Sequence, residues 1–201
     1  ARATDDAMVV ADMPFLSVGV DEAQSVEHCG RMLKEADADA VKLESGPHTV
    51  DLTDHLTDLG IPVMAHLGLT PQHVNQLGGY GRQGTTTAAA ERILELAAAH
   101  EDAGAFAVVL EHVPANVASQ VTAALDVPTI GIGAGPDTDG QVLVLTDVFG
   151  LSERSPPFSK QFGDVRSEME SAVADYKAAV ESGDFPADEH SHVADDVDQI
   201  Y

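Results

Sequence analysis

Short apolar runs separated by longer amphipathic stretches are the feature that most constrains the fold of this chain. The runs lie at residues 8–11, 40–43, 62–65, 106–110, 128–132 and 141–145, and each is too short for a helix and rich in Val, Ile or Leu. Strands that alternate with helices predict repeated β/α units around a parallel sheet. Strands of this kind fit either an open doubly wound sheet or most of an eight-stranded β/α barrel, and spacing alone does not decide between them.

The amphipathic stretches predict helices with one apolar face each. The apolar faces are Val26, Cys29 and Leu33; Ala89, Ile93, Leu96 and Ala97; and Met169, Ala172, Val173, Tyr176 and Val180. Pro114 follows the fourth strand, where proline suits the first turn of a helix through Val117 and Val121. We expect one domain over residues 1–201, with an acidic C-terminal tail from about residue 187. Cys29 is the only cysteine, which excludes an intrachain disulfide and zinc sites of several thiolates.

The charge balance excludes two classes of partner. The chain has 34 Asp and Glu against 10 Lys and Arg, for a net charge of −24. Such a surface repels phosphate groups, so we expect neither nucleic acid nor anionic membranes as partners. The acids are scattered along the chain, a pattern that suits a halophilic source, because molar salt screens charges beyond about 3 Å. The sequence contains neither a membrane-spanning apolar run nor the pattern of a signal peptide, and we expect a cytoplasmic protein.

Ionisable side chains end several of the predicted strands. They are Asp12, Glu44, His66 and Glu111. In a barrel all these strand ends lie on one face, which carries the active site, so we expect the four side chains to converge. A single acid at such a position is as often a helix cap or a solvated loop residue, and a single histidine is more often structural than catalytic. The convergence of several such residues is what favours a functional site.

Two of these acids indicate a magnesium site. Asp12 and Glu44 are hard oxygen ligands with no thiolate nearby in the sequence, which favours magnesium over zinc or copper. Lys42 lies two residues before Glu44 on the same strand, so both side chains point to the same side. A lysine there is suited to bind the carboxylate or oxo group of a small acid. The glycine-rich run at 131–135 lacks the spacing of a dinucleotide or phosphate-binding loop, and its glycines are better explained by tight turns.

Eight motifs in order resemble those of ketopantoate hydroxymethyltransferases. They are VVADMPF (9–15), VKLESG (41–46), HLGLTPQ (66–72), GGYGRQG (78–84), VLEHVP (109–114), IGIGAG (130–135), DGQVLVLTDVFG (139–150) and EHS (189–191). The resemblance covers essentially the whole chain. It implies an α/β fold, an eight-stranded β/α (TIM) barrel whose strands three to eight are represented here.

The resemblance also implies a reaction and its participants. Enzymes of this family use Mg²⁺ to add a hydroxymethyl group from 5,10-methylenetetrahydrofolate, or from a modified pterin in some archaea, to 3-methyl-2-oxobutanoate in a class II aldol-type step. By motif, Asp12 matches a magnesium ligand that also borders the substrate, Glu44 a carboxylate of the metal site, and Lys42 a substrate-binding group. Glu111 matches the proton acceptor, and His66 a supporting position. The resemblance further implies a ring-based homo-oligomer such as a decamer.

The sequence departs from the family pattern at two places. Nothing in it matches the first two strands, whose Asp-Ser motif supplies another magnesium ligand and a hydroxyl for the substrate. At roughly 30 residues per β/α unit, we expect about 60 to 70 residues to be missing before residue 1. Ser45 stands where the family has glycine, which puts the local loop geometry in doubt.

Two alternative functions remain open on the sequence. One is a magnesium-dependent oxo-acid lyase of the isocitrate lyase type, although such enzymes carry a catalytic cysteine in a loop and Cys29 is predicted to lie on a helix. The other is a non-catalytic assembly subunit. Retention of Asp12, Lys42, Glu44 and Glu111 together argues against that role, because a subunit without a reaction has no physical need for clustered buried charges.

Overall fold

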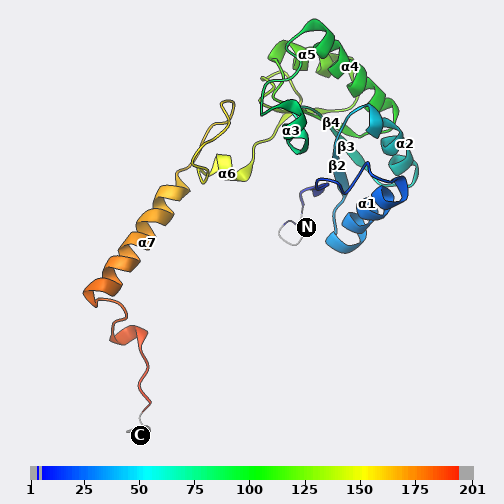
Figure 1. Cartoon of the computed structure of the whole chain (residues 1–201). Helices are drawn as coiled ribbons and strands as arrows, with labels where there is room; N and C mark the ends of the chain where they lie inside the picture. Colours follow the sequence, from blue (N-terminus) through cyan, green and yellow to red (C-terminus); the bar gives the residue numbers. More distant parts are fainter. Residues whose placement is uncertain (1–3, 5, 195–201) are drawn as a thin grey trace. The chain divides into compact units, whose positions relative to one another are not determined.

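The computed structural model describes residue 4 and residues 6–194, which fall into two compact units that divide between Val142 and Leu143. The first unit carries the β-sheet, and the second carries a long helix (Figure 1). The expectation of one barrel domain over residues 1–201 stays a prediction. Of the predicted acidic tail, residues 195–201 lie outside the described residues.

The sheet contains six parallel strands in the order in which they occur in the chain. They are β1 (Val10–Asp12), β2 (Ala40–Glu44), β3 (Val63–Gly68), β4 (Ala107–Glu111), β5 (Thr129–Ile132) and β6 (Gly140–Gln141). A doubly wound sheet reverses its strand order part-way, whereas a barrel adds each strand next to the preceding one. The consecutive order therefore excludes the doubly wound alternative, and the sheet is an arc of a β/α barrel. The predicted α/β fold is confirmed.

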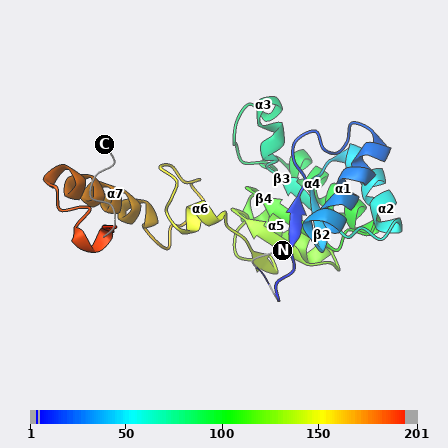
Figure 2. The same cartoon turned by 90° about the horizontal axis from the view of Figure 1, so that it is seen from below.

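Four helices form an outer arc around the strands (Figures 1 and 2). They are α1 (Glu22–Ala36), α2 (Val50–Asp58), α4 (Thr87–Asp102) and α5 (Ala115–Ala124). The start of α1 is fixed by Asp21, whose carboxylate accepts from the Gln24 N–H at 3.0 Å, and that of α4 by the Thr86 hydroxyl. Pro114 precedes the first residue of α5, as its position after β4 predicts. Short elements complete the first unit: η1 (Pro47–Thr49), η2 (Pro71–His73) and α3 (Val74–Leu77).

Two hydrophobic clusters fill the space between strands and helices. One joins β2 and β3 to α1 and α2 through Val41, Leu43, Val63, Cys29, Leu52 and Leu56. The other joins β3 and β4 to α4 and α5 through Ala65, Leu67, Val108, Leu110, Ile93, Ala97, Val117 and Val121. Because successive side chains of a strand point to opposite faces, the residues between these apolar positions point away from the helices. Lys42, Glu44, His66 and Glu111 are on that opposite face.

The predicted sixth strand is largely wrong. We expected it over residues 141–145, but β6 ends at Gln141 and Val144 precedes the short helix α6 (Leu145–Val148). Its partner β5 ends at Ile132, the residue opposite Val142 in this register, and Gly133 then turns the chain with a φ of 63°, so no residue of β5 lies opposite residues 143–145. Val142, Val144 and Leu145 are accordingly exposed by 45%, 55% and 62%.

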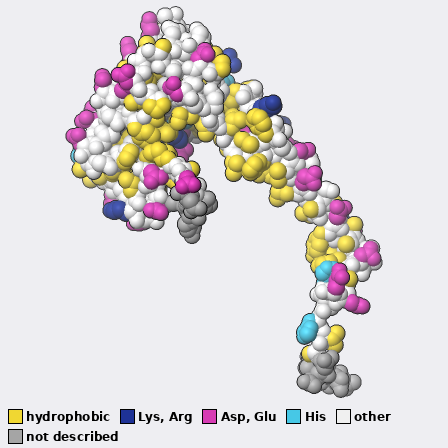
Figure 3. Space-filling model, turned by 180° about the vertical axis from the view of Figure 1, so that it is seen from behind, with side chains coloured by type: hydrophobic (Ala, Val, Ile, Leu, Met, Phe, Trp, Pro, Cys, Tyr) yellow, Lys and Arg dark blue, Asp and Glu magenta, His cyan; other side chains and the backbone are white. Residues whose placement is uncertain are grey.

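The second unit is dominated by α7 (Val165–Ser182), followed by η3 (Asp188–His190). The predicted C-terminal helix is thus present, and its apolar face is formed by Met169, Val173, Tyr176 and Val180 as expected. No residue of α7, which the structure describes in full, is buried, and hydrophobic side chains are visible along it in Figure 3. Acidic side chains are scattered over the surface in the same view. Among the described residues, no helix is both long and apolar enough to cross a membrane.

Candidate active site

Four of the predicted site residues form a continuous series across β1 to β4. Lys42 Nζ lies 2.7 Å from Asp12 Oδ1 in an ion pair and 3.4 Å from His66 Nδ1. On the other side of the ring, His66 Nε2 lies 3.1 Å from Glu111 Oε2. The series Asp12–Lys42–His66–Glu111 therefore links four neighbouring strands. Of the four strand-end side chains that we expected to converge, the series contains Asp12, His66 and Glu111, whereas Glu44 lies outside it.

The strand register explains why these side chains meet. Asp12 and Lys42 are direct partners across β1 and β2. Lys42 pairs with Met64 and His66 pairs with Val109, so Lys42 to His66 and His66 to Glu111 are diagonal neighbours on the inner face. Diagonal positions on adjacent strands are within reach of long side chains. The contacts thus follow from the parallel pairing of strands.

His66 is the most buried member of the series and Asp12 the most exposed. The side chain of Asp12 is 59% exposed and that of Lys42 20%, whereas His66 and Glu111 are 3% and 15% exposed. The buried end therefore holds a carboxylate and an imidazole, and the open end an ammonium group paired with a carboxylate. A small acid approaching from the exposed end therefore meets the Asp12–Lys42 pair before it meets His66 and Glu111.

Glu44 is held separately by residues whose roles the sequence analysis missed. Both carboxylate oxygens accept from the Gln72 N–H, at 2.9 and 3.1 Å, and His73 Nδ1 lies 3.1 Å from Oε2. The Gln72 side chain in turn donates to the Met13 carbonyl at 2.8 Å, which ties the loop after β3 to the end of β1. The motif HLGLTPQ contained Gln72, but only the folded chain shows that it orients Glu44.

Ser45, the departure from the family's glycine, has a definite structural role. Its hydroxyl donates to the Leu43 carbonyl at 2.9 Å and faces the His66 N–H at 3.3 Å, while its own N–H donates to the His66 carbonyl at 2.8 Å. Ser45 thus continues the pairing of β2 with β3 at the height of His66. The loop geometry that the replacement of glycine had put in doubt is therefore stabilised by the hydrogen bonds of Ser45.

Backbone hydrogen bonds hold the end of β4, which carries Glu111, in place. The next residue, His112, has a φ of 49°, a left-handed conformation that costs a non-glycine residue of the order of 1–3 kcal/mol and often occurs at functional sites. The His112 carbonyl accepts from the Gln83 N–H at 3.0 Å, and its N–H donates to Ile132 at 2.8 Å. The Glu111 carbonyl accepts from the Leu69 N–H at 2.8 Å. These bonds fix the backbone that carries Glu111.

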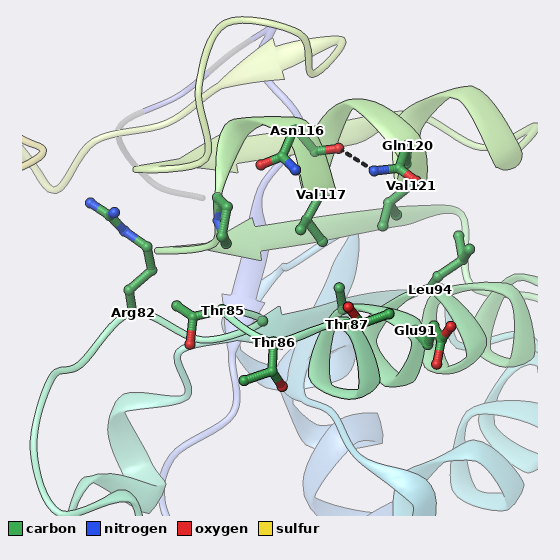
Figure 4. A pocket seen from close by; sticks show the side chains of 13 residues that line it. Arg82, Thr85, Thr86, Thr87, Glu91, Leu94, Asn116, Val117, Gln120 and Val121 are labelled. Carbon is green, nitrogen blue, oxygen red and sulfur yellow. Dashed lines mark hydrogen bonds between the residues drawn. The ribbon is translucent and has the colours of Figure 1, made fainter.

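A cavity of about 510 Å³ lies elsewhere, between α4 and α5 (Figure 4). It is lined by helix residues such as Leu94 and Val121 and by the loop from Arg82 to Thr86. None of the predicted site residues is among those that line it. Its place in the helical layer separates it from the inner face of the sheet, and we do not assign it to the site.

Cys29 is unsuited to be a catalytic thiol. It lies on α1 and is fully buried in the cluster that packs against β2, and this burial raises its pKa to about 11. A thiol with a raised pKa is a poor nucleophile near neutral pH, because the thiolate is the reactive form. The oxo-acid lyase alternative, which needs a reactive cysteine, therefore loses its candidate residue.

Comparison with known proteins identifies the family. Residues 1–188 match the family model described as ketopantoate hydroxymethyltransferase. The chain belongs to the ketopantoate hydroxymethyltransferase family. It is accordingly a hydroxymethyltransferase of pantothenate biosynthesis, as the motifs indicate.

The relatives named 3-methyl-2-oxobutanoate hydroxymethyltransferase include haloarchaeal and bacterial proteins. One from Halobacterium salinarum is 77% identical over 201 residues, which is 100% of this chain and 73% of that relative. One from Natronomonas pharaonis is 70% identical over the whole chain and 75% of the relative, and one from Geobacter sulfurreducens is 51% identical over 94% of the chain and 72% of the relative. The predicted family is confirmed, and the relatives at 70% identity or more named here are from haloarchaea. The chain spans about three quarters of the length of these relatives.

Among solved structures, an N-acetylneuraminate lyase from Mycoplasma synoviae is similar with a TM-score of 0.43 and 11% identity, over 62% of this chain and 45% of that one.

The carboxylates of Asp12 and Glu44 are of the chemical type that binds Mg²⁺, although they do not by themselves complete a metal coordination shell. The described residues contain no group of three or more His, Cys, Asp or Glu side chains that could hold a metal. Mg²⁺ is usually bound through one or two carboxylates, with waters and substrate oxygens completing its shell. Asp12 is open to solvent, and Glu44 retains a lone pair beyond the donors of Gln72 and His73. The donor set therefore fits an ion that the substrate helps to bind.

Proposed function

We propose that this chain transfers a hydroxymethyl group to 3-methyl-2-oxobutanoate, with the series Asp12–Lys42–His66–Glu111 at the centre of its active site. The observation that carries the proposal is the meeting of these side chains on the inner face of the sheet, at the carboxyl ends of its strands. In β/α barrels this end carries the active site. The family membership supports the reaction, and the geometry supports the roles proposed below.

Lys42 is the group that binds the oxo acid. Its ammonium is the cation of the series and its side chain is 20% exposed, so an anionic substrate can reach it without first displacing the buried His66. Asp12 holds Lys42 in place at 2.7 Å, and its side chain, which is 59% exposed, is accessible to a bound acid as well. A charge-assisted contact with a small carboxylate is strong when solvent access is limited.

Asp12 and Glu44 are the residues that would hold Mg²⁺. When bound, the ion supplies Lewis-acid stabilisation of negative charge on the 2-oxo oxygen. Glu44 is fixed by the Gln72 N–H and His73, so its orientation is set before the metal arrives. Preorganised carboxylates of this kind support metal affinity because little side-chain freedom is lost on binding.

Glu111 is the base that removes the proton from C3 of the oxo acid. The carboxylate takes the proton and the C–H electron pair becomes the enolate, whose C3 then forms a bond to the methylene carbon of the folate. One C–N bond of that methylene carbon breaks as the C–C bond forms, and water then displaces the second folate nitrogen. The two nitrogens take up the proton held by Glu111 and one proton from the water, giving 2-dehydropantoate and tetrahydrofolate. The one-carbon donor is 5,10-methylenetetrahydrofolate or a modified archaeal pterin, and the working form is a ring-based homo-oligomer.

Product formation tests the proposed function. The full chain, in molar KCl with Mg²⁺, is incubated with 3-methyl-2-oxobutanoate and ¹³C-labelled methylenetetrahydrofolate, and the label is followed by NMR. We expect a ¹³C-hydroxymethyl signal of 2-dehydropantoate that requires both substrates. Lys42→Met keeps the length of the side chain without its charge and should raise the KM for the oxo acid. An unchanged KM in that variant would contradict the role of Lys42.

A further inference from the structure

His66 is the residue whose role the proposed function leaves open. Its ring lies between a cation and a carboxylate, with Nδ1 at 3.4 Å from Lys42 Nζ and Nε2 at 3.1 Å from Glu111 Oε2. The side chain is 3% exposed, so no bulk water competes for either nitrogen. Nε2 has no well-aligned hydrogen-bond partner among the described residues, although the Glu111 oxygen is close.

The two neighbours together determine which ring nitrogen carries the proton. A lysine ammonium has donors and no acceptor, so the nitrogen that faces Lys42 has to offer its lone pair. Neutral histidine then carries its proton on the other nitrogen, Nε2. That nitrogen faces Glu111, whose ionised carboxylate has only acceptors. Both contacts are satisfied by one tautomer, whereas the Nδ1–H tautomer would place donor against donor and acceptor against acceptor.

We propose that His66 is a positioning residue, held as its Nε2–H tautomer by Lys42, and that its N–H orients the Glu111 carboxylate for proton removal. This proposal rests on the assignment of Glu111 as the base. The 3.1 Å between His66 Nε2 and Glu111 Oε2 is a hydrogen-bonding distance, so alignment requires a change in angle and not in separation. A carboxylate oriented by a buried donor has one oxygen engaged and the other directed to the substrate.

The ring also separates two opposite charges. Lys42 and Glu111 are diagonal to the same residue from opposite sides, and each contacts one nitrogen of His66. Without the ring, an ammonium group and a carboxylate that share a partly buried face attract each other strongly. A direct pair would engage the base and withdraw the cation from Asp12. His66 thereby keeps the substrate-binding group and the base in separate positions.

Two substitutions separate the two nitrogens of His66. Glutamine places an amide N–H near the position of Nε2, so His66→Gln keeps a donor towards Glu111 and loses the acceptor for Lys42. Asparagine places an amide oxygen near the position of Nδ1, so His66→Asn keeps the acceptor for Lys42 and loses the donor. We expect His66→Asn to lower kcat by about 10- to 100-fold with little change in the KM for the oxo acid. We expect His66→Gln to raise that KM with a smaller loss of kcat.

The matched control is His100, a second buried histidine that is hydrogen-bonded to Thr49 and Thr53 on the helix side of the sheet. His100→Asn and His100→Gln should show no such split between kcat and KM. A structural role for His66 would likewise move both parameters alike in its two variants. Equal losses of kcat in His66→Asn and His66→Gln would overturn the proposal.

The tautomer is measured directly by long-range ¹H–¹⁵N correlation spectra of the ring, with the His66 signals assigned by their loss in His66→Gln. We expect the Nε2–H pattern, and the Nδ1–H pattern would overturn the proposal whatever the kinetics. Glu111→Gln distinguishes this failure from failure of the proposed function. Parental C3 proton exchange in that variant would overturn the base, and with it the role of His66, while leaving the tautomer to be read independently.

Discussion

Replacing Gly68 with alanine tests whether the close approach of β3 to β4 positions the base. Gly68 is the last residue of β3, has a φ of 94°, and pairs in register with Glu111. A Cβ added there would collide with the Glu111 carbonyl oxygen and lie 2.8 Å from Val113 Cγ1. The new methyl group would therefore push on the backbone that carries the base.

Gly60→Ala is the matched control, because Gly60 has a similar φ of 83° and a Cβ there would meet nothing within 4 Å among the described residues. We expect Gly60→Ala to lower the free energy of unfolding by about 1–2 kcal/mol, the cost of a left-handed conformation. Gly68→Ala adds overpacking to this cost, and we expect a loss of about 2–5 kcal/mol.

The assay is urea unfolding in molar KCl, combined with the rate of C3 proton exchange at a temperature where both variants are folded. A displacement of about 1 Å of a catalytic group can lower a rate by about 10²-fold, so Gly68→Ala should lose exchange while Gly60→Ala keeps it. Equal destabilisation of the two variants would refute the steric reasoning. Parental exchange in folded Gly68→Ala would show that this contact does not position Glu111.

Three further predictions concern salt, pH and metal. With a net charge of −24, the fold should melt at a higher temperature in multimolar KCl than in dilute buffer, because the screening length falls from about 30 Å at 0.01 M to about 3 Å at 1 M; a flat or falling melting temperature would contradict this. Burial lowers the pKa of His100, so its unfolded form binds a proton first as the pH falls. The contribution of the neutral His100 ring to the free energy of unfolding should therefore be fully present above the unfolded pKa of about 6.5 and decrease below it. The fall of the urea midpoint with decreasing pH should be shallower in His100→Gln. Equal slopes in the two proteins would contradict the role of this residue. Asp12→Asn and Glu44→Gln should each weaken Mg²⁺ binding in calorimetric titration, and unchanged affinity in both would remove these residues from the metal site.

Much of the inner face could be predicted from the sequence because it follows from local rules. The two-residue spacing of Lys42 and Glu44 sets them on one side of β2, and strand ends collect at one rim of a barrel. These rules suffice to bring Asp12, His66 and Glu111 together once the strands pair in parallel.

The remaining features depend on contacts that no local pattern contains. The role of Gln72 arises from a loop that reaches back to Glu44 and to Met13, 28 and 59 residues away in sequence. The run at 141–145 has strand-like composition, yet the neighbouring strand β5 ends at Ile132, before the turn at Gly133. The tautomer of His66 is set by its two neighbours in space. Composition fixes none of these, because each depends on a partner from elsewhere in the chain.

The assignment of Glu111 as the base is tested most directly by hydrogen exchange at C3 of 3-methyl-2-oxobutanoate. Enolisation alone exchanges this proton for deuterium, so no folate is needed and the first chemical step is isolated. Proton NMR in heavy water, with Mg²⁺ and molar KCl, gives the rate for the parent chain and for Glu111→Gln, which keeps the size of the side chain but cannot accept the proton. General base catalysis typically contributes about 10² to 10⁴ in rate, and we expect a loss of that order with the oxo acid still bound. Exchange at the parental rate in Glu111→Gln would show that another residue is the base.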